Sequence, residues 1–227
     1  MFIALKKIKN YWVSDASFVT LLVILVFTVF IMPIFIDVES DNVLFLNVIF
    51  LALFFVGIFS SGDRTFIIIT SILFLLHLVL KIIRLSDLPL DFYLMERVVG
   101  ILNLIVFIVI NVRLLFRDDQ IDVYRVIGAI NVYLLLALFG SFGFEIIYFL
   151  TGSTIGGEVE LYGDDRDYVS YIYYSLVSIT TVGYGDIFPL NVPTKMLSVF
   201  LSAIGILYPA VIIAKLVAAA SNIKHQD

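Results

Sequence analysis

Long apolar stretches and short polar breaks alternate along the chain. A helix rises about 1.5 Å per residue, so about 20 apolar residues cross the roughly 30 Å hydrocarbon core of a bilayer. The breaks contain charged residues or turn formers such as Ser61, Gly62 and Asp63. The pattern predicts six membrane-spanning helices, over residues 18–36, 43–59, 66–83, 98–116, 123–150 and 195–220.

The composition supports a membrane protein. Hydrophobic residues make up 62% of the 227 residues and charged residues 15%, whereas soluble domains have about 45–50% and about 25%. A net charge of −5 argues against a nucleic-acid binder. The absence of cysteine excludes disulfides, thiolate catalysis and a cysteine-ligated metal. The composition therefore indicates an integral membrane protein with several helices.

The basic residues favour one orientation in the membrane. Lys6, Lys7 and Lys9 precede the first apolar stretch. No small-residue cleavage site follows them, so this stretch is interpreted as a retained helix rather than a signal peptide. A cytoplasmic N-terminus places most Lys and Arg residues inside, as the positive-inside rule requires. We expect a multi-pass protein of the plasma (cell inner) membrane with both termini cytoplasmic.

A short apolar and aromatic segment lies between the last two stretches. Residues 168–179 are too few to span a bilayer, at about 18 Å in helical form, and Asp167 stands at the expected N-cap. A helix that ends inside the membrane directs its negative dipole end at the next segment of the chain, and this end favours a cation. Non-helical backbone at this depth is tolerated where it is buried in protein or lines a watery path. This segment therefore predicts an ion pathway.

The next residues are Thr181-Val182-Gly183-Tyr184-Gly185. Glycine at alternate positions allows backbone angles closed to other residues, so that successive carbonyl groups can turn to one side. A ring of such carbonyls can replace the water around a dehydrated cation. A Gly-x-Gly turn alone would indicate only a loop, but its setting after a half-helix favours ion binding. One chain supplies one loop, so a ring of four requires a homotetramer.

Residues from about 123 to 218 resemble the pore domain of tetrameric potassium channels, and the whole chain resembles the six-helix branch of that superfamily. The resemblance rests on the segment Thr-Thr-Val-Gly-Tyr-Gly-Asp at residues 180–186 and on its flanking helices. It implies K⁺ as the permeant ion, no organic cofactor, and membrane lipids as the other partners. It also implies that K⁺ binds the carbonyls of residues 180–184 and the hydroxyl of Thr181, the full set being Thr180, Thr181, Val182, Gly183 and Tyr184.

Four residues are expected to support this filter, namely Gly185, Asp186, Tyr173 and Tyr174. The family often has two tryptophans where this chain has the two tyrosines. We expect Tyr174 to hydrogen-bond Asp186 behind the filter, and the Tyr184 ring to point away from the axis and brace the loop. These departures bear on inactivation more than on selectivity.

The last apolar stretch carries a candidate gate. Gly205 follows Pro189 at the spacing at which the family places its hinge glycine, and Pro209 favours a kink. Ala210, Ala214 and Ala218 share one helical face. Two interpretations stay open, since these alanines would either line a wide cytoplasmic mouth or allow close helix packing.

The fourth apolar stretch, residues 98–116, lacks a charged ladder. It contains only Arg113, with Arg97 and Arg117 at its ends, whereas voltage sensing needs about three to four moving charges per subunit. Steep voltage dependence is therefore not expected. The predicted division is a four-helix sensor-like domain at residues 1–117, a pore domain at 118–220 and a short cytoplasmic tail at 221–227.

Acidic residues near the pore leave further alternatives open. Glu145, inside the fifth stretch, is either functional or paired structurally. The acids of residues 156–167 either concentrate cations at a vestibule or form a solvated turret. They are Glu158, Glu160, Asp164, Asp165 and Asp167.

The sequence thus predicts an all-α membrane protein with six transmembrane helices, a re-entrant pore helix and a selectivity-filter loop, assembled as a homotetramer. It predicts a potassium-selective channel, not an enzyme. The alternatives are a nonselective cation channel, or a pore subunit gated by lipid, tension or partner proteins.

Overall fold

The computed structural model describes residues 17–38, 43–59, 63–86, 92–116 and 123–223. Helices account for most of these residues. The first is interrupted by a π-helical turn, η1, and a 3₁₀ turn, η3, precedes α8. The helical elements are α2 Ser17–Val26, η1 Phe27–Ile31, α3 Met32–Val38, α4 Val43–Ile58, α5 Arg64–Arg84, α6 Tyr93–Phe116, α7 Val123–Thr151, η3 Asp165–Asp167, α8 Tyr168–Ile179 and α9 Val192–Ile223.

Five helical segments of the described residues are long and apolar enough to cross a membrane, so the protein is a multi-pass membrane protein. The second predicted span is shorter: α4 has 16 residues, or about 24 Å, which falls short of the roughly 30 Å core. The membrane span predicted over residues 43–59 therefore stays a prediction. The five segments are Ser17–Ile36, Arg64–Arg84, Tyr93–Phe116, Val123–Thr151 and Val192–Ala218.

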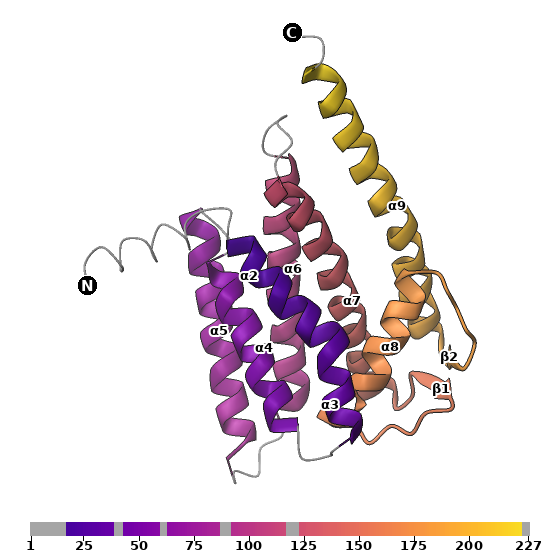
Figure 1. Cartoon of the computed structure of the whole chain (residues 1–227). Helices are drawn as coiled ribbons and strands as arrows, with labels where there is room; N and C mark the ends of the chain where they lie inside the picture. The colour runs from indigo at the N-terminus through magenta and orange to yellow at the C-terminus, as the bar shows by residue number, and fades with distance from the viewer. Residues whose placement is uncertain (1–16, 39–42, 60–62, 87–91, 117–122, 224–227) are drawn as a thin grey trace.

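Helices α2 to α7 form a bundle in which α2 and α3 make one continuous rod, and this rod, α4, α5, α6 and α7 run in alternating directions (Figure 1). The start of α2 and the end of α9 lie toward one end of this bundle. The ends of α3 and α5 and the starts of α4 and α6 lie at the other end, together with the start of α8. The polar residues near these helix ends are therefore brought to the same level as the start of α8.

Helices α2 to α6 share one core with helices α7 to α9. The most extensive packing between helices is that of α6 against α7. Phe50 of α4 lies edge-on to Phe142 of α7, with ring centroids 5.1 Å apart, and to Tyr168 of α8 at 5.3 Å. The Tyr168 hydroxyl also donates to the Thr28 carbonyl in η1 at 2.8 Å. Helix α8 therefore packs on the N-terminal helices of the same chain.

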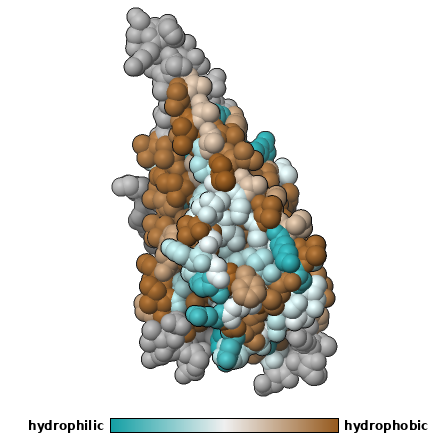
Figure 2. Space-filling model, turned by 90° about the vertical axis from the view of Figure 1, so that its right-hand side faces the viewer, coloured by the Kyte–Doolittle hydropathy of each residue, from teal (hydrophilic) through white to brown (hydrophobic). Residues whose placement is uncertain are grey.

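Helix α9 stands apart from the bundle. In the apolar segment with which α9 could cross a membrane, only 11% is buried inside the protomer, whereas the corresponding share in α7 is 67%. Helix α9 is attached through the Tyr208 hydroxyl, which donates to the Ala129 carbonyl at 3.0 Å, and through Ser202, which donates to the Ser178 carbonyl at 2.9 Å. Figure 2 shows the face that bears α8 and α9, where a pale and teal region lies between brown apolar areas. Bulky apolar side chains of α9, such as Ile206 and Leu207, are exposed.

A two-stranded sheet departs from the purely helical prediction. Strand β1, Ile155–Gly157, pairs antiparallel with β2, Ile187–Pro189. Gly157 has a φ of +117°, and a Cβ there would collide with the Asp186 carbonyl oxygen. Strands of three residues leave no alternating pattern in a sequence, which is why the prediction missed them.

Candidate ion-conduction site

The predicted half-helix is present as α8, Tyr168–Ile179, with 12 residues. Asp167 occupies the N-cap position, but its side chain makes no capping bond to α8. It instead accepts hydrogen bonds from the backbone N–H groups of Tyr162, at 2.8 Å, and Gly163, at 2.7 Å. Burial raises the pKa of the Asp167 carboxyl, although these two donors act in the opposite direction. Asp167 thus closes the loop before the helix rather than capping it.

The end of α8 curls directly into the loop predicted to bind ions. The N–H of Thr181 donates to the Ser178 carbonyl at 3.1 Å, and the N–H of Val182 donates to the Val177 carbonyl at 3.2 Å. The Ile179 carbonyl accepts the Tyr133 hydroxyl of α7 at 3.3 Å. The last turn of α8 is therefore held by the neighbouring helix, which fixes where the loop begins.

The loop backbone alternates in handedness. Gly183 and Gly185 have φ values of +57° and +85°, so the predicted need for glycine at these positions is confirmed. Thr181 also has a positive φ, +60°, which the sequence did not indicate. A β-branched residue in this region costs on the order of 1–3 kcal/mol, and such strain concentrates at functional sites. That these residues bind ions stays a prediction.

The loop is uncovered within one chain. Residues 180–186 are all exposed, and the Val182 and Tyr184 side chains reach 52% and 73% exposure. The Tyr184 ring is therefore not packed inside the protomer, and its predicted bracing role stays a prediction. Large apolar and aromatic side chains left this exposed on one chain mark a surface for protein contact or lipid.

The partner of Asp186 is Tyr173, so the expectation for Tyr174 is wrong. The Tyr173 hydroxyl donates to Asp186 Oδ2 at 2.5 Å. Tyr174 instead shares a hydrogen bond with Ser198 of α9 at 2.8 Å, and its ring packs on Phe144. Consecutive residues of a helix point about 100° apart, so only one of the two tyrosines faces the loop. The bond from Tyr173 lowers the pKa of the Asp186 carboxyl.

The chain beyond the loop is tied back to the segment before α8. The Asp186 carbonyl accepts the Glu158 N–H at 3.2 Å, and the Leu190 N–H donates to the Thr154 carbonyl at 2.8 Å. Asn191 then caps α9, because its Oδ1 accepts the Thr194 N–H at 2.9 Å. Both ends of the loop are therefore anchored.

The candidate gate residues lie along α9. Gly205 packs so closely on the end of α8 that a Cβ would collide with the Ile179 carbonyl oxygen. Close packing is therefore a second reason for glycine at this position, in addition to its predicted role as a hinge. Pro209 lies within the continuous helix. The three alanines of the predicted gate face are exposed in the protomer, namely Ala210, Ala214 and Ala218.

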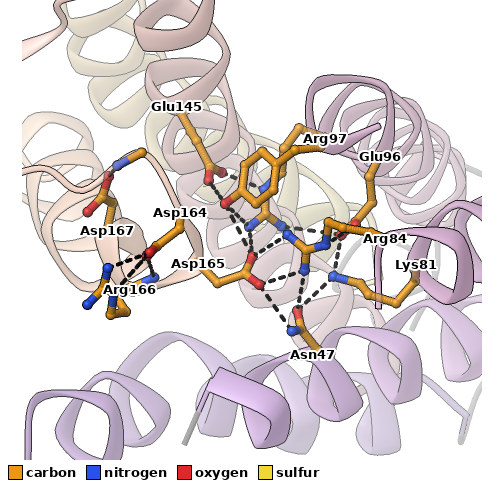
Figure 3. A network of polar contacts seen from close by, with 12 residues as sticks. Asn47, Lys81, Arg84, Glu96, Arg97, Glu145, Asp164, Asp165, Arg166 and Asp167 are labelled. Atoms are coloured by element: carbon orange, nitrogen blue, oxygen red, sulfur yellow. Dashed lines mark hydrogen bonds and ion pairs between the residues drawn. The ribbon is translucent and has the colours of Figure 1, made fainter. Parts of the chain in front are cut away.

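A buried ion-pair cluster lies at the same end of the bundle as the start of α8 (Figure 3). Glu96 of α6 pairs with Lys81 and with Arg84, the latter at 3.0 Å from Nε to Oε2. The cluster was not predicted from the sequence. A signal was present, because cations end one apolar stretch and charged residues begin the next on the same predicted side of the membrane.

Arg97 links the cluster to the turn that leads into α8. Its Nε lies 2.7 Å from Glu145 Oε2, so Glu145 is paired. Its Nη2 donates to Asp165 of η3, the turn that directly precedes α8. Burial opposes ionisation of Asp165, but the charge of Arg97 and the hydrogen bond from Arg84 outweigh it, and the pKa of this carboxyl lies well below its ordinary value. Asp165 therefore belongs to the buried cluster rather than to a solvated turret.

Comparisons with known proteins agree with this geometry. Residues 132–222 match a protein-family model described as "Ion channel". The chain is 50% identical over 34 residues to "Potassium channel K2" of Plasmodium falciparum (isolate 3D7), which covers 15% of this chain and 2% of that protein. It is 44% identical over 41 residues to "Potassium channel K2" of Plasmodium berghei (strain Anka), covering 18% and 3%. The similarity thus spans a small part of these relatives. No solved structure matches the chain.

The apolar helices define a multi-pass helical membrane protein, and residues 132–222 are similar to ion channels, a class of proteins that are not enzymes. Over shorter segments the chain is similar to two potassium channels.

Proposed function

We propose that the protein is a potassium-selective channel that conducts K⁺ passively through the loops of four chains. The observation that carries the proposal is the alternation of positive φ at Thr181, Gly183 and Gly185, directly after the end of α8. In such a backbone, successive carbonyl groups turn toward one side and can replace the hydration shell of a cation.

Selection in this proposal belongs to the backbone oxygens of residues 180–184 and the Thr181 hydroxyl. The negative end of the α8 dipole favours a cation near the loop. Several ions occupy adjacent sites and displace one another, so that binding does not prevent release. The name that both Plasmodium relatives carry, "Potassium channel K2", agrees with K⁺ as the permeant ion.

A homotetramer around a common axis completes the site. The exposed loop and the weakly buried α9 support this assembly, because both leave apolar side chains that the protomer does not cover. The proposed protomer has six spans, with α4 as the shortest, and a pore domain at residues 118–220 joined to the sensor-like residues 1–117. Both termini face the cytoplasm, and the tail at 221–227 lies there.

Steep voltage dependence is not part of the proposal. Moving one charge through 100 mV supplies about 2.3 kcal/mol, so several mobile charges are needed. Arg97 of α6 is buried and ion-paired to Glu145 and Asp165. Arg113, at the other end of α6, is 64% exposed and lies 3.6 Å from Asp63. Neither arrangement provides a ladder of charges free to move.

Ion flux from purified protein in liposomes tests the proposal. Under separate K⁺ and Na⁺ gradients, the protein is expected to carry K⁺ and to reject Na⁺. Gly183→Ala should abolish the flux, because alanine is strained at a φ of +57°. Gly152→Ala is the matched control, since Gly152 has a φ of +75° outside the loop.

Equal flux of both ions would establish a nonselective cation channel instead. Flux that survives Gly183→Ala would overturn the assigned pathway. Flux that appears only after addition of lipid, membrane tension or a partner would assign the gating stimulus.

A further inference from the structure

The buried cluster sits between the four-helix part of the chain and the start of the pore helix. We propose that Arg97 is a positioning residue for ion selection: through Asp165 it fixes the start of α8, and so holds the filter loop at the other end of α8 in its selective geometry. This inference rests on the proposed function and assigns a filter-positioning role to the four-helix part.

Arg97 is held from three directions. Its side chain is 2% exposed and lies over the rings of Tyr93 and Phe142, at 4.8 and 5.0 Å from their centroids. One nitrogen pairs with Glu145 of α7, and another donates to Asp165 and to the Tyr93 hydroxyl. The rigid planar fork of a guanidinium makes such a set of bonds direction-specific. Arg97 therefore fixes the position of Asp165 relative to α6 and α7.

Asp165 accepts hydrogen bonds from several helices of the four-helix part. Besides Arg97, its carboxylate accepts Arg84 Nη2 at 2.6 Å from α5 and Asn47 Nδ2 at 3.1 Å from α4. The Tyr93 hydroxyl lies at 3.2 Å. Because Asp165 belongs to the 3₁₀ turn that leads directly into α8, these bonds set where the pore helix starts.

A second contact holds the same end of the pore helix. The hydroxyl of Tyr168, the first residue of α8, donates to the Thr28 carbonyl at 2.8 Å. Helix α8 is a single 12-residue unit, so a displacement of its start is transmitted to its end. That end carries Thr180 and the curled backbone of Thr181 and Val182.

The charges of the cluster balance within the described residues. Three cations meet three carboxylates, so the cluster needs no outside counter-ion; they are Lys81, Arg84 and Arg97 with Glu96, Glu145 and Asp165. Buried ion pairs pay a large desolvation cost and are weak evidence for stability. Their directional bonds at the start of α8 point instead to a role in geometry.

Liposome flux with Asp165→Asn and Arg97→Gln tests the inference. Both variants should raise the Na⁺/K⁺ permeability ratio by about tenfold, which corresponds to about 1.4 kcal/mol. Arg97→Lys keeps the charge without the fork and should give an intermediate ratio. Arg113→Gln is the matched control, because it removes an exposed ion pair from the same helix and should leave the ratio unchanged.

Folding is measured separately by size-exclusion chromatography and circular dichroism. If the single variants do not assemble, Arg97→Met combined with Glu145→Leu decides the question, because it removes one cation and one carboxylate and leaves Arg84 paired with Asp165. Apolar side chains of similar volume often replace buried ion pairs without loss of stability. This variant should assemble and show the raised ratio.

An unchanged ratio in any assembled variant of Arg97 or Asp165 would overturn the inference. Failure of all of them to assemble would also overturn it, since the cluster would then serve folding alone. A wild-type protein without selective K⁺ flux would instead refute the proposed function, and the wild-type and Gly183→Ala samples report that outcome independently.

Discussion

Tyr173 donates its hydroxyl hydrogen to Asp186 across the base of the loop, at 2.5 Å between the oxygens. The bond joins α8 to the residue that ends the loop, at a place exposed in the single chain. This hydrogen bond therefore links α8 to the backbone that carries the proposed ion sites.

Removal of the hydrogen bond between Tyr173 and Asp186 should destabilise the conducting state of the loop. In Tyr173→Phe we expect K⁺ flux to start normally and then to decay faster than in the wild type, because the end of the loop is released. Tyr174→Phe is the control, since Tyr174 bonds Ser198 and not Asp186. Time courses of flux in liposomes measure the difference, and equal decay in the two variants would contradict the expectation.

The same bond predicts a pH dependence. Tyr173 lowers the pKa of Asp186, so the stabilisation is present above the ordinary carboxyl pKa and is lost as the pH falls through the lowered value. In Tyr173→Phe the pKa of Asp186 returns toward its ordinary value. Flux decay should therefore accelerate at acidic pH in Tyr174→Phe, whereas in Tyr173→Phe it is already fast and should depend much less on pH, measured at a series of acidic pH values.

The positive φ of Thr181 predicts that a substitution there can raise the stability of the protein and lower its selective K⁺ flux. Thr181→Gly should raise the free energy of unfolding by about 1 kcal/mol, because glycine adopts a positive φ without strain. It should also lower selective K⁺ flux, because the hydroxyl is lost and the loop becomes less rigid. Thr181→Ser keeps the hydroxyl and should conduct nearly as the wild type does. Thermal unfolding in detergent and liposome flux measure the two effects, and a gain in both would contradict the prediction.

A substitution at Gly205 distinguishes a packing role of this residue from a hinge role. Gly205→Ala should destabilise the contact between α8 and α9, because the new methyl group meets the Ile179 carbonyl. We expect a lower melting temperature together with weaker K⁺ selectivity. Gly128→Ala is the control, since its nearest neighbour would be at an ordinary 3.4 Å. A pure hinge would instead change how often the pore opens and leave selectivity intact, which single-channel recording distinguishes.

Asp165 predicts a loss of stability that depends on pH. Leaving a buried cation without its partner costs about 3–5 kcal/mol, so Asp165→Asn should unfold well below the wild-type temperature at neutral pH. The folded pKa of Asp165 lies below the ordinary 3.8, so its contribution is present above pH 3.8 and is lost as the pH falls through the folded value. The difference between the two proteins should therefore persist at mildly acidic pH and shrink only below 3.8.

The periodic and local features of the fold were predictable from sequence. Apolar runs indicated the helices, and residues 168–179 were placed as a half-helix because they are apolar yet too short to span. The positions of Gly183 and Gly185 indicated where the backbone needs a positive φ. These features depend on neighbours a few residues apart, which a single sequence displays.

The missed features depend on pairs far apart along the chain. Asp165 meets Asn47 across 118 residues and Arg97 across 68, and no local pattern specifies such partners. The choice between Tyr173 and Tyr174 depends on the rotation of α8 against α9, which a sequence does not give. The positive φ of Thr181 is imposed by the loop against the preference of the residue.

The packing of α8 on η1 and α4 of its own chain has a genetic consequence. In a tetramer of the proposed kind, each filter loop is supported by the N-terminal helices of its own subunit, through contacts such as Tyr168 with Thr28. A lesion in those helices would then affect the loop of the subunit that carries it and leave its three neighbours supported. Mixed assemblies of wild-type and altered subunits would show graded, dose-dependent phenotypes.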